Sequence, residues 1–461
     1  MALVGGLVLV VFLLLRPMEV WPEIAKLHSL EVLTSITAIG IGVEALSSRR
    51  APSGSPQLGW LGAFLGWACA ATLVKLGPAD GLKAISNMIL GPLFMVLVVF
   101  AVPTLGRLRA MTTVVLGCAT LIAAVAVHQG TQPRQCIELR DESLTRLASD
   151  LQSVPDGRLC EGPRQCESGG APESEYLCER VGWFGGTSYA GRVRWRGQLD
   201  DPNEVAVFLG GFLPFLFLRE GWRARRIGSI VAVGIHLGLV VCAMVLTQSR
   251  GGQLVLGAVV IAMLVRRFGW WSVVLGVAAT LPIMLLSWRS DSGAEGSSQE
   301  RAEILSEGLL FFKSHALLGS GVGQFTNENS LSMTAHNSYL LIAAEVGLPG
   351  YLLWCGLVWT TVKIPVSLAL RPPTGLDPRL GAYANALAAS TMSLLIGIDF
   401  LSFAYKQVFF LWIGLAGALY GAVREHHPEF GIETTRRDVV GICALAVVPL
   451  VIVRLVALTA H

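Results

Sequence analysis

Long runs of apolar residues are the feature that most constrains this chain. The runs 110–128 and 227–247, for example, contain no Asp, Glu, Lys or Arg. A helix of about 20 apolar residues crosses the ~30 Å hydrocarbon core of a bilayer and satisfies its own backbone groups. Only 15% of the 461 residues are charged, whereas 53% are hydrophobic. We therefore expect an all-α polytopic membrane protein rather than a set of soluble domains.

Charged residues and Pro/Gly clusters separate these runs into about twelve or thirteen expected transmembrane helices. The first run has no basic segment before it and no small-residue cleavage site after it, so we expect a retained span and not a signal peptide. The expected spans are 2–15, 29–48, 58–75, 84–105, 110–128, 202–218, 227–247, 251–265, 269–287, 337–362, 382–400, 407–422 and 438–458.

Basic residues occupy alternate short loops, which assigns those loops and the N-terminus to the cytoplasm. The loops 129–201 and 288–336 then lie together on the outer face. The net charge of +3 is too small to indicate nucleic-acid binding. The basic residues that set this orientation are Arg49, Arg50, Arg107, Arg109, Arg223, Arg225, Arg226, Arg266, Arg267, Lys363, Arg371, Arg436 and Arg437.

Four of the nine cysteines lie in the first outer loop, and the other five lie within apolar runs. The four are Cys136, Cys160, Cys166 and Cys178, and their spacings lack the CxxC pairs of a zinc site. Clustered loop cysteines indicate two disulfides and an oxidising compartment, with three pairings open. Charge bias and cysteine use are independent signals, and both indicate that this face of the membrane is oxidising and non-cytoplasmic.

The expected organisation has four parts. Residues 1–128 form N-terminal transmembrane helices, and 129–201 form the periplasmic loop with the cysteines. Residues 202–425 form a transmembrane core that includes the periplasmic loop 288–336. Residues 426–461 form a cytoplasmic segment and a C-terminal helix.

The first polar motif, RVRWRGQLDDPN at 192–203, precedes the sixth expected span. Asp201 followed by Pro202 is typical of a helix start, because Asp accepts an amide hydrogen bond and Pro pre-sets the first turn. Its arginines suit a diphosphate or an acidic glycan; interfacial snorkelling explains them equally well. The substrate-binding candidates here are Arg192, Arg194, Arg196 and Asn203.

The second motif, TQSRGG at 247–252, forms a very short outer connection that places Arg250 at the membrane boundary. Ionisable residues at such a depth are costly and are usually functional. The adjacent glycines allow backbone or ligand to approach closely. A simple anchoring arginine is the alternative.

The third motif combines Glu300-Arg301, KSHALLGSGVGQF at 313–325 and AHNSYLLIAAEVGLPG at 335–350. The preceding stretch DSGAEGSSQE, 291–300, indicates the start of a flexible loop. The glycines of GSGVGQF do not form a dinucleotide fingerprint, because no strand precedes them.

His336 opens the tenth expected span on the outer face. A histidine beside a loop that holds Arg301 is suited to general-base catalysis; the alternative is a structural histidine next to a capping Asn337 or Ser338. Glu345 lies about 13 Å further along the helix, so we expect a buried bundle contact rather than a direct partner of His336.

The ordered set of DPN, TQSRGG, ER, GSGVGQF and AHNSYLLIAAEVGLPG resembles the O-antigen ligase and Wzy-type polymerase family over roughly residues 200–425. The AHN…E.G..G element after a G.G..F loop is the most distinctive part. The first five spans match only in their hydrophobic character. The cysteine-bearing loop and a thirteenth span depart from the family pattern.

The resemblance implies an inverting, metal-independent glycosyl transfer on the periplasmic face. The donor would be a glycan on undecaprenyl diphosphate, and the acceptor a sugar hydroxyl of lipid A-core or of a nascent polysaccharide. By motif, the essential histidine and two arginines of the family correspond to His336, Arg250 and Arg301, with Asn337 and Glu345 as further substrate-binding candidates. The three are expected to share one cavity, with membrane lipids as surroundings and with no cofactor, metal or nucleic acid.

Ligase, polymerase and protein-glycosylating enzyme remain open alternatives at this point. A transporter or flippase of lipid-linked glycans is the alternative from another class, although internal repeats and broken midplane helices typical of transporters are not evident. A structural subunit of an export complex is the third possibility.

Overall fold

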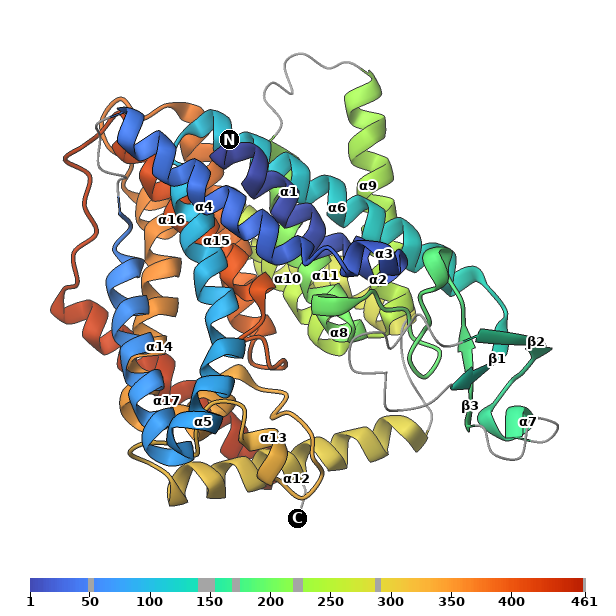
Figure 1. The fold of residues 1–461 in the computed structure, drawn as a ribbon. Helices are drawn as coiled ribbons and strands as arrows, with labels where there is room; N and C mark the ends of the chain where they lie inside the picture. The colour runs from blue at the N-terminus through green and yellow to red at the C-terminus, as the bar shows by residue number, and fades with distance from the viewer. Residues whose placement is uncertain (49–53, 140–153, 168–174, 219–226, 287–291, 459–461) are drawn as a thin grey trace. The chain divides into compact units, whose positions relative to one another are not determined.

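The computed structural model is predominantly helical, with one small β-sheet (Figure 1). Among the described residues, eight helices are long and apolar enough to cross a membrane, and four shorter apolar helices accompany them. The expected all-α polytopic membrane protein is confirmed. The residues described are 1–48, 54–139, 154–167, 175–218, 227–286 and 292–458.

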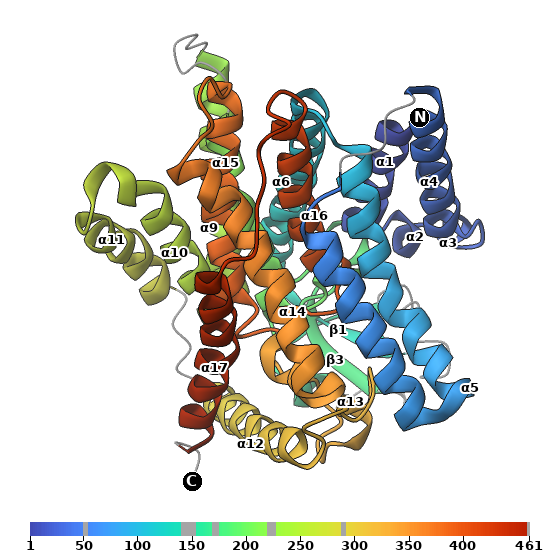
Figure 2. The ribbon, with the colours of Figure 1, turned by 90° about the vertical axis from the view of Figure 1, so that its left-hand side faces the viewer.

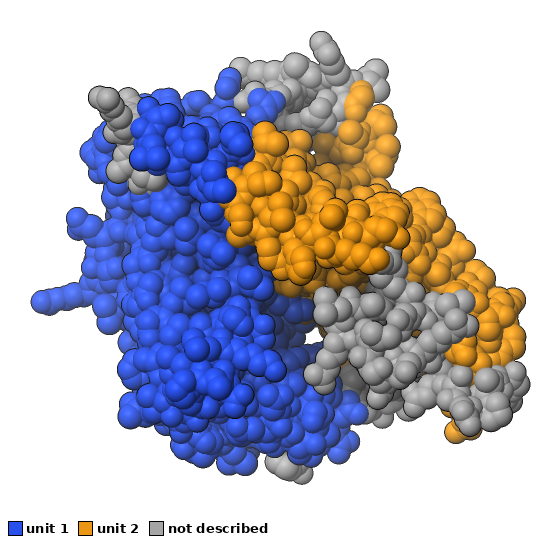
Figure 3. Space-filling model, in the orientation of Figure 1, with its two compact units in different colours: residues 1–3, 37–110, 289–461 blue, residues 4–36, 111–288 orange. Residues whose placement is uncertain are grey.

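The chain divides into two compact units, shown in different colours in Figure 3. Unit 1 comprises residues 1–3, 37–110 and 289–461, and unit 2 comprises residues 4–36 and 111–288. Each unit is described by itself below. Three helices contribute residues to both units, namely α1 (Ala2–Leu15), α4 (Ser29–Ser48) and α6 (Leu105–Thr131).

Unit 1 contains α5 and the helices from residue 292 onward. Its elements are α5 (Gln57–Ala101), α12 (Ser292–Ser314), α13 (Phe325–Glu328), α14 (Ser338–Leu370), α15 (Pro378–Gly397), α16 (Gln407–Arg424) and α17 (Arg436–Leu458). Unit 2 contains α2 (Pro17–Val20), α3 (Pro22–Ala25), α7 (Pro163–Glu167), α8 (Pro202–Phe212), α9 (Ile227–Thr247), α10 (Arg250–Phe268), α11 (Trp271–Leu286) and the strands β1 (Arg134–Leu139), β2 (Val154–Leu159) and β3 (Glu175–Arg180).

Helix α5 reverses direction at Gly77, whose φ of 75° lies in the left-handed region. Pro78 follows, and a residue before proline is disfavoured in helical conformation. The two halves of α5 run side by side in Figure 1. They approach closely next to the turn, since a Cβ added at Gly81 would lie 3.3 Å from the Cα of Leu73. The two separate spans expected at 58–75 and 84–105 are therefore the two arms of this element.

Helix α16 is the centre of unit 1, since all of its residues from Val408 to Val423 are buried. It packs most extensively against α5, where Gly91 leaves room for the ring of Phe410. The buried amide of Gln57 donates to the Thr361 hydroxyl at 2.7 Å and to the Ile413 carbonyl at 3.1 Å. A helix that is apolar on every side needs such burial, because it has no face for water.

Helices α14 and α17 run antiparallel in unit 1 (Figure 2). At one end Lys363 Nζ lies 2.6 Å from Asp438 Oδ2, and at the other end Leu340 packs with Val453. The charged ends 363 and 436–438 thus lie together, as expected if both belong to the cytoplasmic side.

The loop expected at 288–336 contains a helix that the sequence did not predict. The stretch 291–300 was expected to begin a flexible loop, but α12 starts at Ser292 and runs for 23 residues, so this expectation is wrong for residues 292–300. Leu305 and Leu309 of α12 pack against the ends of α14 and α17. Tertiary packing, rather than local propensity, stabilises this helix.

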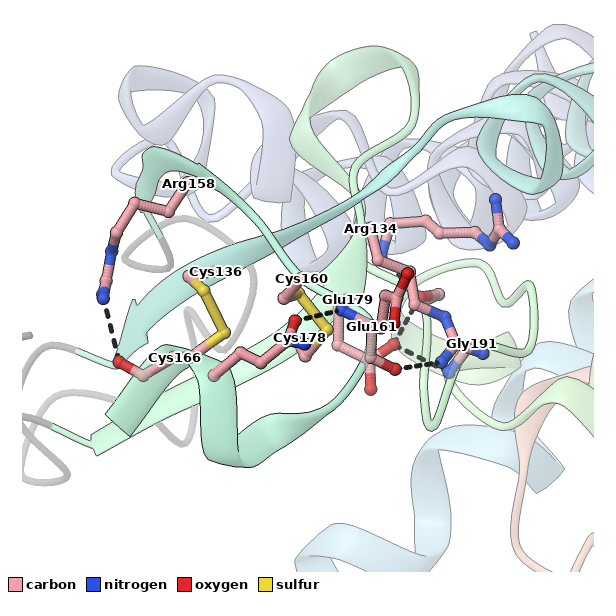
Figure 4. Close-up of a disulfide and its surroundings, with 12 residues drawn as sticks. Arg134, Cys136, Arg158, Cys160, Glu161, Cys166, Cys178, Glu179 and Gly191 are labelled. Atoms are coloured by element: carbon pink, nitrogen blue, oxygen red, sulfur yellow. Dashed lines mark hydrogen bonds between the residues drawn. A yellow bond between two sulfur atoms is a disulfide. The ribbon is translucent and has the colours of Figure 1, made fainter. Parts of the chain in front are cut away.

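A three-stranded antiparallel sheet, with strand order β2-β1-β3, lies in the cysteine-bearing loop of unit 2. Two disulfides join Cys136 to Cys166 and Cys160 to Cys178, and the four sulfurs form a buried cluster (Figure 4). The structure thus selects one of the three possible pairings. So small a sheet buries little apolar surface, and cross-links compensate for that.

We expect removal of one of these cross-links to loosen the sheet selectively. Replacing Cys160 and Cys178 together by Ser opens a loop of 18 residues and should cost about 3 kcal/mol. Limited proteolysis should then cleave within the sheet, whereas replacing the free, exposed Cys242 and Cys443 should not change the digestion pattern. Non-reducing peptide mapping that joined Cys136 to Cys160 would contradict the pairing.

Candidate active site

The predicted site residues are distributed over both units. Arg301, His336, Asn337 and Glu345 belong to unit 1, whereas Arg250 belongs to unit 2. Convergence of His336, Arg250 and Arg301 in one cavity therefore stays a prediction. Within each unit, the structure shows how the backbone around these residues is held.

In unit 1, hydrogen bonds join the loop 316–321 to the segment 344–348 of α14, and we call this element the interlock. Helix α14 is interrupted at Gly347, where φ is 68°. The interruption frees carbonyls that a continuous helix would satisfy. The amides of Ser320 and Gly321 donate to the carbonyls of Ala344 and Glu345 at 3.1 and 2.9 Å. The glycine loop thus replaces the missing helical hydrogen bonds.

Two further contacts complete this interlock. Trp67 Nε1 donates to the Val346 carbonyl at 2.9 Å, and the Leu348 amide donates to the Ala316 carbonyl at 2.7 Å. A Cβ added at Gly319 would lie 2.2 Å from the Glu345 carbonyl carbon. Only glycine fits so close an approach at a positive φ. The spacing of the two glycine-rich motifs therefore has a structural explanation.

Glu345 lies inside this interlock, buried as the sequence analysis expected. Its Oε1 accepts a hydrogen bond of 3.3 Å from the Phe325 amide, at the start of α13. Tyr405 lies beside the carboxyl group, and burial, together with that carboxyl, raises the pKa of the Tyr405 phenol well above its ordinary value. Glu345 thus fixes the segment after the glycine loop; a role in substrate binding stays a prediction.

His336 is half-buried between two buried neighbours, Ala335 and Asn337. Its φ of 49° places it in the left-handed region, which is uncommon for a residue other than glycine. Strained residues persist when the surrounding structure over-determines them, and they concentrate at functional sites. The backbone of His336 is thus held in an unfavourable conformation while its side chain keeps partial access to solvent.

The residues after His336 anchor this conformation. Asn337 is the N-cap of α14, accepting from the Leu340 amide at 2.9 Å, and its Nδ2 donates to Asp399 Oδ1 at 2.8 Å. The Ser338 hydroxyl donates to the Leu401 carbonyl at 2.5 Å. The capping role considered for Asn337 is confirmed. The segment 398–403, which was not singled out in the sequence, thus positions the start of α14.

Arg301 is half-buried on α12, one turn before Leu305. Ala302 and Ile304 beside it are buried, and Ile304 belongs to a cluster that also contains Phe325 and Ala335. This cluster joins the Arg301 helix to the residue immediately before His336. Arg301 and His336 therefore sit on elements that share one apolar core in unit 1.

In unit 2, the first and second motifs meet at Arg192. Its Nη2 donates to Asn203 Oδ1 at 2.9 Å, and its Nε donates to the Thr247 carbonyl at 2.8 Å. Asp201 forms a capping box with Glu204 at the start of α8, which confirms the expected helix start. Buried Arg192 therefore ties the DPN motif to TQSRGG.

Arg250 is exposed and begins α10. Ser249 caps this helix by accepting from the Gly252 amide at 3.0 Å, and Gln248 before it adopts a φ of 51°. Gly252 packs so closely on Ala206 of α8 that an added Cβ would lie 2.3 Å from the alanine Cβ. Gly252 thus serves helix packing, while the Arg250 side chain remains exposed.

Arg194 and Arg196 donate hydrogen bonds to backbone carbonyls within unit 2. Arg194 Nε donates to the Thr187 carbonyl at 2.8 Å, and Arg196 Nη1 donates to the Glu19 carbonyl at 2.9 Å. Neither snorkelling nor an anionic ligand is needed to explain these contacts. Binding of a diphosphate or glycan by these two residues stays a prediction.

Comparison with known proteins bears on the same residues. Residues 235–355 match the model of the O-antigen ligase family. This stretch is similar to O-antigen ligases, and we call it the O-antigen ligase stretch. The resemblance predicted from the motifs is confirmed, and the O-antigen ligase stretch contains Arg250, Arg301 and His336. No curated protein matches the chain.

Asp399 offers a test of how the start of α14 is held. Burial raises the pKa of the Asp399 carboxyl, opposed by the Asn337 hydrogen bond. A carboxyl with a raised pKa in the folded state stabilises the fold below its unfolded pKa, and that contribution is lost as the pH rises through the folded value. We expect the melting temperature of detergent-purified protein to fall less between about pH 4 and 7 in Asp399→Asn than in wild type.

Asn at position 399 retains an oxygen that accepts from Asn337, so the variant should fold normally. Asp377→Asn is the matched control, because it removes one carboxylate in unit 1 and keeps an N-cap side chain on α15. If the melting temperature of Asp399→Asn depended on pH as that of wild type does, protonation of the Asp399 carboxyl would not be coupled to folding.

Proposed function

We propose that this multi-pass membrane protein transfers a glycan from undecaprenyl diphosphate to a sugar hydroxyl on the periplasmic face of the bacterial inner membrane. The O-antigen ligase stretch, which contains the predicted histidine and both arginines, is the observation that carries this proposal. The acceptor is lipid A-core if the protein is a ligase, and a nascent polysaccharide if it is a polymerase.

In this proposal His336 is the general base. The acceptor hydroxyl loses its proton to the imidazole as its oxygen attacks the anomeric carbon from the side opposite the diphosphate, so the configuration inverts. The bond from carbon to the diphosphate oxygen breaks, and the leaving diphosphate carries the electron pair away. Arg250 and Arg301 stabilise this negative charge, because a guanidinium matches a phosphate with two parallel hydrogen bonds.

The interrupted helix α14 supports an enzyme over a transporter. Transporters use broken helices to expose free carbonyls to ions or substrates near the midplane. In unit 1 the carbonyls of Ala344, Glu345 and Val346, next to the interruption, accept hydrogen bonds from the glycine loop and from Trp67. These groups are occupied within the protein and offer no ligand site.

Replacing His336 tests the proposed base. Asn tolerates left-handed backbone, so His336→Asn should retain the fold and lower transfer by at least about 100-fold, the lower range for a general base. The measurement is the rate of transfer by purified protein from a lipid-linked glycan. His315→Ala, at the half-buried histidine after α12, is the matched control and should remain active. A His336→Asn protein that is stable and fully active would show that His336 has a structural role and is not the general base.

Replacing Arg250 tests the charge that opposes the leaving group. Arg250→Lys should lose most of the activity, because an ammonium cannot reproduce the planar bidentate contact of a guanidinium. Arg379→Lys, in the exposed first turn of α15, is the control. Transfer at the wild-type rate by Arg250→Lys would show that Arg250 anchors the protein and does not stabilise the leaving group.

Chelation tests the proposed metal independence. Among the described residues, the one cluster with three potential ligands is Cys136, Cys160 and Cys166, and all three are disulfide-bonded. We expect transfer by the purified protein to continue at the same rate in excess EDTA. Loss of activity that only manganese or magnesium restores would reject this part of the mechanism.

A further inference from the structure

A short hairpin after β3 presents aromatic side chains on unit 2. Val181 pairs with Thr187 in antiparallel fashion, and the Gly182 amide donates to the Gly186 carbonyl at 2.8 Å. The tip of this hairpin is the 3₁₀ turn Trp183–Gly185. The side chains of Trp183 and Phe184 are 49% and 46% exposed, so about half of each large ring is open. These two residues are the aromatic tip.

The aromatic tip is rigid and strained. Phe184 has a φ of 62°, a conformation that is rare and energetically unfavourable for a bulky side chain. The guanidinium of buried Arg196 donates to the Phe184 carbonyl. Gln129, also buried, donates to the Gly186 carbonyl at 2.9 Å. Hydrogen bonds from these two buried side chains therefore hold the backbone of the hairpin at residues 184 and 186.

One ring of the tip is also fixed by stacking. The Trp183 indole lies on the imidazole of His128 with 4.4 Å between ring centroids and an interplanar angle of 25°. One face of the indole is thereby covered, while about half of the Trp183 side chain remains exposed. Beyond the hairpin, Tyr189 is 58% exposed, with the Arg194 guanidinium 5.9 Å from its ring centroid.

Charged side chains support the tip from within the unit: Arg196 and Glu179 are buried, and Arg194 is half-buried. Arg194 and Arg196 donate to carbonyls of residues 184, 187 and 19, and Glu179 accepts from the amides of Ala190 and Gly191. The apolar rings of the tip are thus exposed, while the charged side chains that support them bond to backbone groups of the protein. Folding stability alone would favour the opposite arrangement, with apolar side chains inside and charged side chains outside.

We propose that the aromatic tip binds the glycan portion of a substrate by stacking against sugar rings, and this inference rests on the proposed function. A pyranose offers an apolar C–H face to an aromatic ring and hydroxyls to polar groups at its edge. The guanidinium of half-buried Arg194 lies 5.9 Å from the centroid of the exposed Tyr189 ring and supplies a polar group beside it. The cysteine-bearing loop thereby acquires a role in holding the oligosaccharide acceptor.

Fixed geometry favours a sugar over a lipid surface. Aromatic side chains anchor a protein at the bilayer interface through their amphipathic character, which tolerates many orientations. A strained Phe184, two buried pinning side chains and a stacked indole fix the orientation of the rings. Stacking on a sugar ring depends on orientation, whereas partition into headgroups does not.

The test uses full-length protein in nanodiscs and the oligosaccharide that mild acid releases from lipopolysaccharide of the encoding strain. Isothermal titration should give a Kd about tenfold higher for Trp183→Ala combined with Phe184→Gly, a loss of about 1.4 kcal/mol of binding free energy, because the double variant removes both stacking rings. Glycine at 184 relieves the backbone strain, so the variant should fold. Trp271→Ala, at an exposed indole elsewhere in unit 2, should bind as wild type does.

Two outcomes would overturn the inference. One is an unchanged Kd in the double variant while wild-type protein still performs transfer. The other is quenching of Trp183 fluorescence by brominated lipids, measured as the difference from Trp183→Phe, which would identify a membrane anchor. Loss of binding in the double variant, with no transfer by wild type under any condition, would support the glycan site and reject the proposed enzyme.

Discussion

The requirement that every backbone group find a partner inside the bilayer governs unit 1. An interrupted membrane helix leaves carbonyls that lipid cannot satisfy. At Gly347 the protein solves this problem by inserting the loop 316–321, whose amides bond to the carbonyls that α14 has released. This loop connects α12 to α13, and His336 stands at the start of α14. The same loop leads to Phe325, which packs in one cluster with Ala335, the residue next to the proposed base.

Local signals in the sequence predicted those features that local chemistry determines. Apolar length predicted the spans, and Asp201 with Pro202 predicted the start of α8, because a cap depends on residues within one turn. Residues 292–300 are polar and rich in small side chains, so no local pattern indicated α12. That helix depends on Leu305 and Leu309, whose partners Leu340 and Val453 are distant in sequence.

The arginines of the first motif show a second limit. Sequence alone indicated only that three cations lie close together on the outer side. Their partners are carbonyls at Thr247, Thr187 and Glu19, up to 177 residues away along the chain. A guanidinium that binds carbonyls and one that binds a phosphate look identical in a sequence. The same holds for the candidate site, where family motifs identified residues and the structure supplied the reasons for their spacing.

The order of the cysteines has a consequence for biogenesis. Cys136 pairs with Cys166 and Cys160 with Cys178, so the two loops interleave and neighbouring cysteines along the chain are not partners. Oxidation in the order of synthesis first joins Cys136 to Cys160, a non-native bond. Escape from it requires a thiolate to attack that disulfide and exchange partners. Conditions that allow thiol–disulfide exchange as well as oxidation therefore favour the native pairing of this loop.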